Sequence, residues 1–270
     1  MFDTSWLKVI TFFGIWAIFW LPIALMVSRS IDWQVGQSLT SQQKLSLLGS
    51  LYLLSPIILL GKIRAENLSL PSLGLSLHPN LLLSILLGIA ISVVGVIVII
   101  LIQSLFNLVS WHRENIPQLF SSLLPILLLG LLISTVEETV FRGYIFTTFA
   151  QDYSLWWAAT FSSFIFALLH LIWERKQTLP QIPGLWLMGM VLTVARVIDD
   201  GSLGLAIGLH TGWIWSYTCI DSANIVTYNQ QTWLTGFNGQ PLAGVFGVLG
   251  LMITGLILWF GANSNFLLFV

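Results

Sequence analysis

LLISTVEETVFRGYIFTTF, at positions 131–149, is an apolar stretch interrupted by two adjacent carboxylates and one guanidinium. On a helix, Glu138 and Arg142 lie one turn apart and can pair in the favourable acid-first order. Glu137 points about 100° away from that pair and is left without a local partner. A charge at lipid depth costs roughly 2.5–3.5 kcal/mol even on the most lenient scale, so such residues usually mark function.

These charges have two interpretations. Glu138 and Arg142 can form a buried, self-neutralised ion pair that only fixes helix packing. That interpretation explains the pair but leaves Glu137 unexplained. We therefore interpret the stretch as part of a functional site.

The composition places the chain in a membrane. Of the 270 residues, 56% are hydrophobic and only 8% are charged, which is more apolar surface than a soluble protein of this length can bury. The net charge is −1 and no basic run is present, so nucleic acid is not an expected partner. The lone cysteine, Cys219, excludes an internal disulfide and a thiolate metal cluster.

Hydropathy predicts an all-α polytopic membrane protein with about eight transmembrane helices that enclose an intramembrane polar cavity. No internal repeat is found, so residues 1–270 are expected to form a single transmembrane domain. The predicted segments of spanning length are 9–28, 44–61, 81–109, 119–149, 154–173, 182–198, 202–220 and 241–262.

Two of the four histidines fall inside predicted spans. His170 lies near the end of a predicted span, in FSSFIFALLHL, and His210 lies in SLGLAIGLHTGWIWSY. A single histidine on an apolar helix is more often a satisfied core residue than a ligand, but two of them beside an unpaired Glu137 favour a site. His78 and His112 fall in predicted loops and are interpreted as surface residues.

One carboxylate and two imidazoles can support hydrolysis in two ways. The glutamate can act as general base on a water while the imidazoles stabilise the oxyanion. Alternatively, the glutamate and both histidines can hold a Zn²⁺ that acidifies its bound water. Spacing does not distinguish the two, because the groups come from three separate helices and no H-E-x-x-H signature is present. Zn²⁺ is therefore the one cofactor considered.

Three motifs together resemble one family. EETVFR at 137–142 resembles the E-E-x-x-x-R motif of the CPBP intramembrane protease family, which includes the CAAX prenyl endopeptidases and bacteriocin-processing relatives. FALLH at 166–170 resembles that family's F-x-x-x-H motif, and His210 matches its next histidine. The resemblance covers about 117–217, which would be the catalytic core.

The resemblance implies a role for each matching residue. Glu137 would activate the water, and Glu138 with Arg142 would form the supporting pair. His170 and His210 would flank the scissile carbonyl. A further matching residue, Phe166, would pack one turn from His170.

Position 214 departs from the family's pattern. The family commonly has Asn four residues after the last histidine, and this chain has Ile214. Isoleucine can neither donate a hydrogen bond to an oxyanion nor ligate a metal. Losing one such donor typically costs about 10²–10³ in rate. One turn after His210, the Ile214 side chain should border the same cavity.

Three hypotheses follow. The first is an intramembrane endopeptidase acting on a membrane-associated protein or peptide. The second is a proteolytically inactive or weakened member of the same fold that serves a partner protein as a membrane scaffold or chaperone, which Ile214 favours. A transporter is a distant third, because no paired short segments occupy corresponding halves of the chain.

Weaker features complete the prediction. Ser134, one turn before Glu137, either hydrogen-bonds it or packs between helices. Arg196 and Asp200 can pair one turn apart, and we interpret them as a membrane-interface anchor rather than a substrate contact. Gly208 and Gly212 bracket His210 and should place it tightly against a neighbouring helix.

Overall fold

The computed structural model describes residues 4–34, 37, 39–76, 79–172, 175–230 and 232–263. Most of these residues are helical, and two short antiparallel strands pair Val109 with Tyr228. The helices and strands are α1 (Thr4–Ser30), α2 (Ser41–Ala65), α3 (Pro79–Leu105), β1 (Val109–Trp111), α4 (Ile116–Glu138), a π-helical segment (Thr139–Ile145), α5 (Phe146–Phe149), α6 (Leu155–Leu169), α7 (Arg175–Thr178), α8 (Ile182–Ile198), α9 (Gly204–Ala223), β2 (Val226–Tyr228) and α10 (Val245–Asn263).

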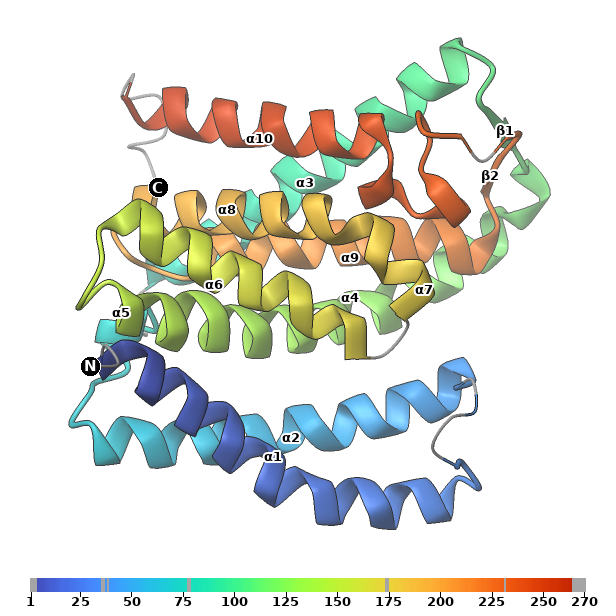
Figure 1. Cartoon of the computed structure of the whole chain (residues 1–270). Helices are drawn as coiled ribbons and strands as arrows, with labels where there is room; N and C mark the ends of the chain where they lie inside the picture. Colours follow the sequence, from blue (N-terminus) through green and yellow to red (C-terminus); the bar gives the residue numbers. More distant parts are fainter. Residues whose placement is uncertain are drawn as a thin grey trace.

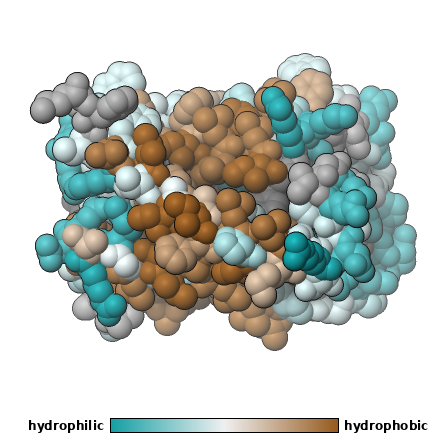
Figure 2. All heavy atoms as spheres, turned by 60° about the horizontal axis from the view of Figure 1, so that its bottom comes forward, coloured by the Kyte–Doolittle hydropathy of each residue, from teal (hydrophilic) through white to brown (hydrophobic). Residues whose placement is uncertain are grey.

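The all-α polytopic membrane fold is confirmed. Each of the eight predicted segments contains a long helix, and six helical stretches in the described part of the chain are long and apolar enough to cross a membrane. A shorter apolar helix covers Val245–Gly261, whereas α9, which holds His210, is not among the six. Figure 2 shows a broad apolar band between two polar ends, as a membrane-embedded surface requires.

Helix α9 lies inside the molecule, packed along α3 and α4, while α8 packs against α6 and α10 (Figure 1). Helices α1 and α2 pair with each other and lie below α4 in this view. The buried side chains of the main core cluster come from both α1 and the α6–α8 region.

Two glycines allow α9 to approach α3 closely. A Cβ at Gly208 would collide with the carbonyl of Ile85, and a Cβ at Gly212 would collide with the Ser92 hydroxyl. The predicted tight packing around His210 is confirmed, and the His210 side chain is only 3% exposed. Small residues on these two helices therefore fix the position of the histidine.

The helix that carries Glu137 continues without a break from α4 through the π-helical segment into α5. The Phe146 N–H bonds to the carbonyl of Phe141, five residues earlier, which is the π-helical pattern. From α6, the Ser162 hydroxyl donates to the same Phe141 carbonyl at 2.7 Å. The charged motif thus lies where the helix changes its winding.

The predicted interface anchor of Arg196 and Asp200 is wrong. Arg196 is buried, with 6% of its surface exposed, and its guanidinium donates to backbone carbonyls, including that of Gly201 at 3.1 Å. Asp200 lies in an exposed turn with a positive φ of 49°. Burial of the long Arg196 side chain against the π-helical segment explains the difference.

Candidate active site

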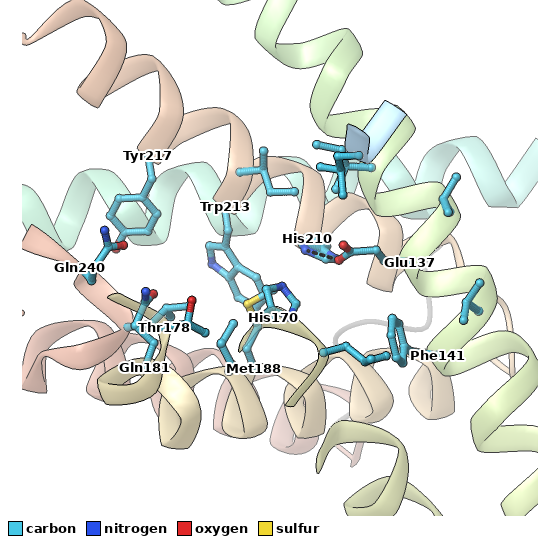
Figure 3. A pocket seen from close by; sticks show the side chains of 18 of the residues that line it. Glu137, Phe141, His170, Thr178, Gln181, Met188, His210, Trp213, Tyr217 and Gln240 are labelled. Carbon is cyan, nitrogen blue, oxygen red and sulfur yellow. Dashed lines mark ion pairs between the residues drawn. The ribbon is translucent and has the colours of Figure 1, made fainter. Parts of the chain in front are cut away.

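A cavity of about 670 Å³ opens inside the helix bundle, and side chains from most of the long helices line it. Its walls are mainly apolar, so the predicted polar cavity is polar only in places. Figure 3 shows Glu137 and His210 together at one end. Four uncharged polar residues lie toward the other end: Thr178, Gln181, Tyr217 and Gln240.

Glu137 projects into this cavity from the last turn of α4. Its Oε2 lies 3.6 Å from His210 Nε2, and 12% of its side chain is exposed. The Tyr52 hydroxyl, from α2, donates a hydrogen bond to Glu137 Oε1. The glutamate that has no partner on its own helix therefore obtains two from other helices.

The predicted pairing of Glu138 with Arg142 is confirmed. Arg142 Nη1 lies 3.1 Å from Glu138 Oε1, and neither side chain is exposed. The guanidinium carbon stands 4.4 Å from the centre of the Phe166 ring, a cation–π contact. A Cβ at Gly189 would lie 3.0 Å from Arg142 Nη2 and 2.6 Å from Ser163 Cβ, so only glycine leaves room there.

His210 lies between the two adjacent glutamates. Its Nδ1 is 2.7 Å from Glu138 Oε1, the same oxygen that accepts from Arg142. Because this carboxylate is an acceptor, Nδ1 carries the proton of that bond. The other ring nitrogen, Nε2, is thereby turned toward Glu137.

His170 is fixed in a similar way. Its Nδ1 is 2.8 Å from the backbone oxygen of Phe166, and a carbonyl can only accept, so Nδ1 is the donor. The rings of Phe166 and His170 meet edge to face at 4.6 Å, which confirms the expected contact. Phe166 also contacts the His210 ring at 6.0 Å. One fully buried ring therefore packs against both histidines.

Glu137, His170 and His210 all line the same cavity. Within the described residues, Glu137 and His210 form an ion-pair contact, whereas none is found between His170 and either of them. The structure therefore brings two of the three predicted residues into contact and places the third on the wall of the same cavity.

The arrangement does not fit the Zn²⁺ alternative. Two imidazoles whose Nδ1–H groups bond to fixed oxygens have the chemistry of metal ligands. However, no three His, Cys, Asp or Glu side chains in the described ranges lie close enough together to hold a metal ion.

Ile214 lines the cavity, as predicted from its position one turn after His210. It packs toward Gly130 of α4, where a Cβ would lie 3.5 Å from Ile214 Cγ2. Ser134 is buried and its hydroxyl has no hydrogen-bond partner in the described part of the chain. Of the two interpretations of Ser134, the structure supports helix packing.

Sequence reasoning missed Tyr52 and gave Arg196 the wrong role. Tyr52 lies in the apolar run LLGSLYLLSP, where a hydroxyl at mid-span is the one available signal. His112 is outside the cavity lining and its Nε2 lies 2.9 Å from the Thr227 hydroxyl, near the two short strands. The interpretation of His78 falls outside the described residues.

Comparison with known proteins supports the resemblance. Residues 119–216 match a family model described as Type II CAAX prenyl endopeptidase Rce1-like, which confirms the CPBP resemblance for that segment. An uncharacterized 24.3 kDa protein of Escherichia coli is 34% identical over 99 residues. That match covers 36% of this chain and 42% of the relative, well under half of its length. No solved structure matches.

Proposed function

We propose that this integral, multi-pass membrane protein is an intramembrane endopeptidase in which Glu137 activates the attacking water. The observation that carries the proposal is the position of Glu137, whose carboxylate faces a cavity and lies between the Tyr52 hydroxyl and His210. The family match over 119–216, which contains every residue of the proposed machinery except Tyr52, supports a CAAX-type protease.

The proposed reaction is a general-base hydrolysis. The Glu137 carboxylate accepts a proton from water as the water oxygen bonds to the peptide carbonyl carbon, and the carbonyl oxygen becomes an oxyanion. The C–N bond then breaks, and the leaving nitrogen takes the proton that Glu137 holds. The products are one new carboxyl terminus and one new amino terminus.

The buried pair supports this chemistry through His210. Glu138 holds the Nδ1–H of His210 at 2.7 Å, and Arg142 holds the same Glu138 oxygen at 3.1 Å, so the imidazole cannot rotate freely. The Phe166 carbonyl fixes His170 by the same principle. In each ring Nδ1 is already engaged, so Nε2 is the nitrogen that can face the substrate. It can donate to the oxyanion when the ring is an imidazolium, with a proton on both nitrogens.

The proposed substrate is a membrane-associated protein or peptide that reaches the site from the lipid bilayer. Uncharged polar groups at the far end of the cavity, including Gln181 and Gln240, suit the amides of a peptide backbone. The apolar walls suit apolar side chains or an attached lipid. Because the family model is named for CAAX prenyl endopeptidases, prenylated proteins are the first substrates to test.

A second candidate function rests on Ile214. An apolar residue in the cavity wall one turn after His210 offers only van der Waals contact, which suits a weakened or inactive member that binds a partner protein. Such a scaffold would need the buried Glu138–Arg142 pair for stability but not Glu137.

Comparative N-terminal proteomics tests the choice. Membranes from cells that carry the wild-type chain, Glu137→Gln or the control Glu114→Gln are compared for new protein termini. Glu114 is an exposed carboxylate away from the cavity, with a side chain that is 72% exposed. Cuts present with wild type and Glu114→Gln but absent with Glu137→Gln support the protease, and identical termini in all three favour the scaffold. Repeating the cleavage with EDTA, then with added Zn²⁺, tests the metal alternative.

A further inference from the structure

Arg196 is a buried cation that the proposed chemistry does not use. It lies on α8 and binds backbone oxygens of three separate segments through its guanidinium. Nε donates to Gly201 at 3.1 Å and Nη2 donates to Ser72 at 3.2 Å. No carboxylate in the described residues lies within ion-pair distance of it. Burying a charge is costly unless it is well hydrogen-bonded, so these carbonyls account for its stability there.

The third segment that Arg196 binds is the π-helical one. Nη1 donates to the carbonyls of Arg142 and Gly143, the latter at 3.4 Å, and to the Thr147 hydroxyl at 2.9 Å. The preceding carbonyl, that of Phe141, accepts from Ser162 of α6. Side chains from α8 and α6 thus bind three successive carbonyls at the place where the helix is widened.

An unbroken series of polar contacts connects Arg196 to Glu137. Arg196 binds the backbone carbonyl of Arg142, and the Arg142 side chain binds Glu138 at 3.1 Å. Glu138 binds Nδ1 of His210 at 2.7 Å, and His210 Nε2 lies 3.6 Å from Glu137. Each contact fixes the group that makes the next one.

We infer that Arg196 is a positioning residue: by binding the carbonyls of the π-helical segment, it sets how Arg142 and Glu138 meet and so turns His210 toward Glu137. A π turn contains more residues than an α turn, so relaxation of the segment to an α-helix changes the angle at which Arg142 projects from Glu138. π-helical turns are frequent at functional sites, where the altered direction of a side chain can orient a reactive group. The link to catalysis rests on the proposed function.

The first test needs no substrate. The full chain, labelled with ¹⁵N-histidine in detergent micelles, is compared with Arg196→Gln, and the ring signals are assigned with His170→Gln and His210→Gln. Arg196→Gln should lose the low-field Nδ1–H signal of His210 and retain that of His170, whose acceptor is the Phe166 carbonyl. An unchanged His210 signal in a folded Arg196→Gln protein would overturn the inference.

A matched control on the same helix is Thr193→Val, because the Thr193 hydroxyl is buried and bonds within α8 to Gly189 at 3.0 Å. It should leave the His210 signal in place, and loss of the signal there would overturn the inference as well. If Arg196→Gln does not fold, Ser162→Ala and Arg196→Lys replace it. Both variants should shift the Nδ1–H signal of His210 without abolishing it. An unshifted signal in both variants would overturn the inference.

The second test uses the membrane protein cut most completely in the proteomic comparison. Arg196→Gln should lower kcat by up to about 10²-fold, the cost of a misplacement of about 1 Å, with KM nearly unchanged. If Thr193→Val and Arg196→Gln lower kcat equally, Arg196 only stabilises the fold and does not position His210. If the wild type cuts nothing, the proposed function fails, while the histidine signals still decide whether Arg196 positions His210.

Discussion

The two walls of the cavity differ in what holds them in place. Behind the wall built by α4, the π-helical segment and α9, buried charged side chains bind one another, centred on Glu138 and Arg142. The α1–α2 hairpin, which lies below α4 in Figure 1, contributes a mainly apolar wall to the cavity. At one end of the hairpin, hydrogen bonds join it to the rest of the protein. They include Ser5 to Asp152 and Tyr144 to Glu66.

This difference separates stability from chemistry. A buried ion pair is strongly destabilising when one partner is removed, because the other charge is left buried and uncompensated. The hairpin reaches the site through the Tyr52 hydroxyl, which donates to the partly exposed Glu137. Changes to the buried Glu138–Arg142 pair should therefore cost folding, whereas changes at Glu137 and Tyr52 should cost activity first.

The largest expected effect is the loss of Arg142. Arg142→Ala leaves the fully buried Glu138 without its cation and should lower the free energy of unfolding by about 3–5 kcal/mol. Glu137→Gln keeps the shape of a side chain that faces the cavity and should fold nearly as well as wild type. Thermal melts of the purified variants in detergent measure both. Equal destabilisation by the two variants would show that Glu137 belongs to the structural network.

The next effect concerns Ile214 in the cavity wall. Ile214→Asn places an amide one turn after His210 and should raise turnover of a cleaved membrane substrate, by up to about 10²–10³ if a missing donor limits the rate. Ile133→Asn, which adds the same amide elsewhere in the cavity lining, is the control and should not raise turnover. A neutral or harmful Ile214→Asn in an active enzyme would mean that another group already serves as the donor.

A smaller effect distinguishes the two ends of the hairpin. Tyr52→Phe removes the hydroxyl that donates to Glu137. The free energy of unfolding should fall by only about 1 kcal/mol, because water in the cavity can replace the lost hydroxyl. The pH dependence of cleavage should change, because the hydroxyl contacts the proposed general base. Tyr144→Phe removes the hydroxyl that donates to Glu66 of the hairpin at 2.8 Å. This change should lower stability without changing the pH dependence of cleavage. Urea titrations and rate profiles of both variants provide the comparison. The reverse pattern would contradict the division proposed between the walls.

The smallest expected effect is a pH dependence of stability that comes from Asp152, at the end of the hairpin that is hydrogen-bonded to the rest of the protein. The Ser5 hydroxyl and N–H and the Thr4 hydroxyl donate to Asp152, which lowers the pKa of its carboxyl below the usual range. The folded-state pKa is the lower one, so this stabilisation is complete above the unfolded value of about 3.9 and is lost as the pH falls through the folded value. Melting temperatures from neutral to acid pH should therefore fall less steeply for Asp152→Asn. If the melting temperatures of the two proteins fall equally with pH, Asp152 contributes nothing to stability through these hydrogen bonds.

Much of the candidate site could be predicted because it is local. An acid and a base four residues apart on a helix must lie on one face, so the Glu138–Arg142 pair followed from the sequence. The same holds for Phe166 and His170, and for the placement of Ile214 one turn after His210. The long apolar runs predicted transmembrane helices, because a segment of about 20 apolar residues can cross lipid as a helix that satisfies its own backbone hydrogen bonds.

The tertiary structure decided how these helices face one another. Tyr52 meets Glu137 across 85 positions of sequence, and Arg196 meets the carbonyl of Arg142 across 54. Contacts of this kind depend on the rotation and crossing of separate helices, which hydrophobic periodicity does not specify when a helix is apolar on every face. The π-helical turn also depended on partners, because its carbonyls accept hydrogen bonds from α6 and α8. Sequence alone therefore supplied the reactive groups, and tertiary packing decided which of them meet.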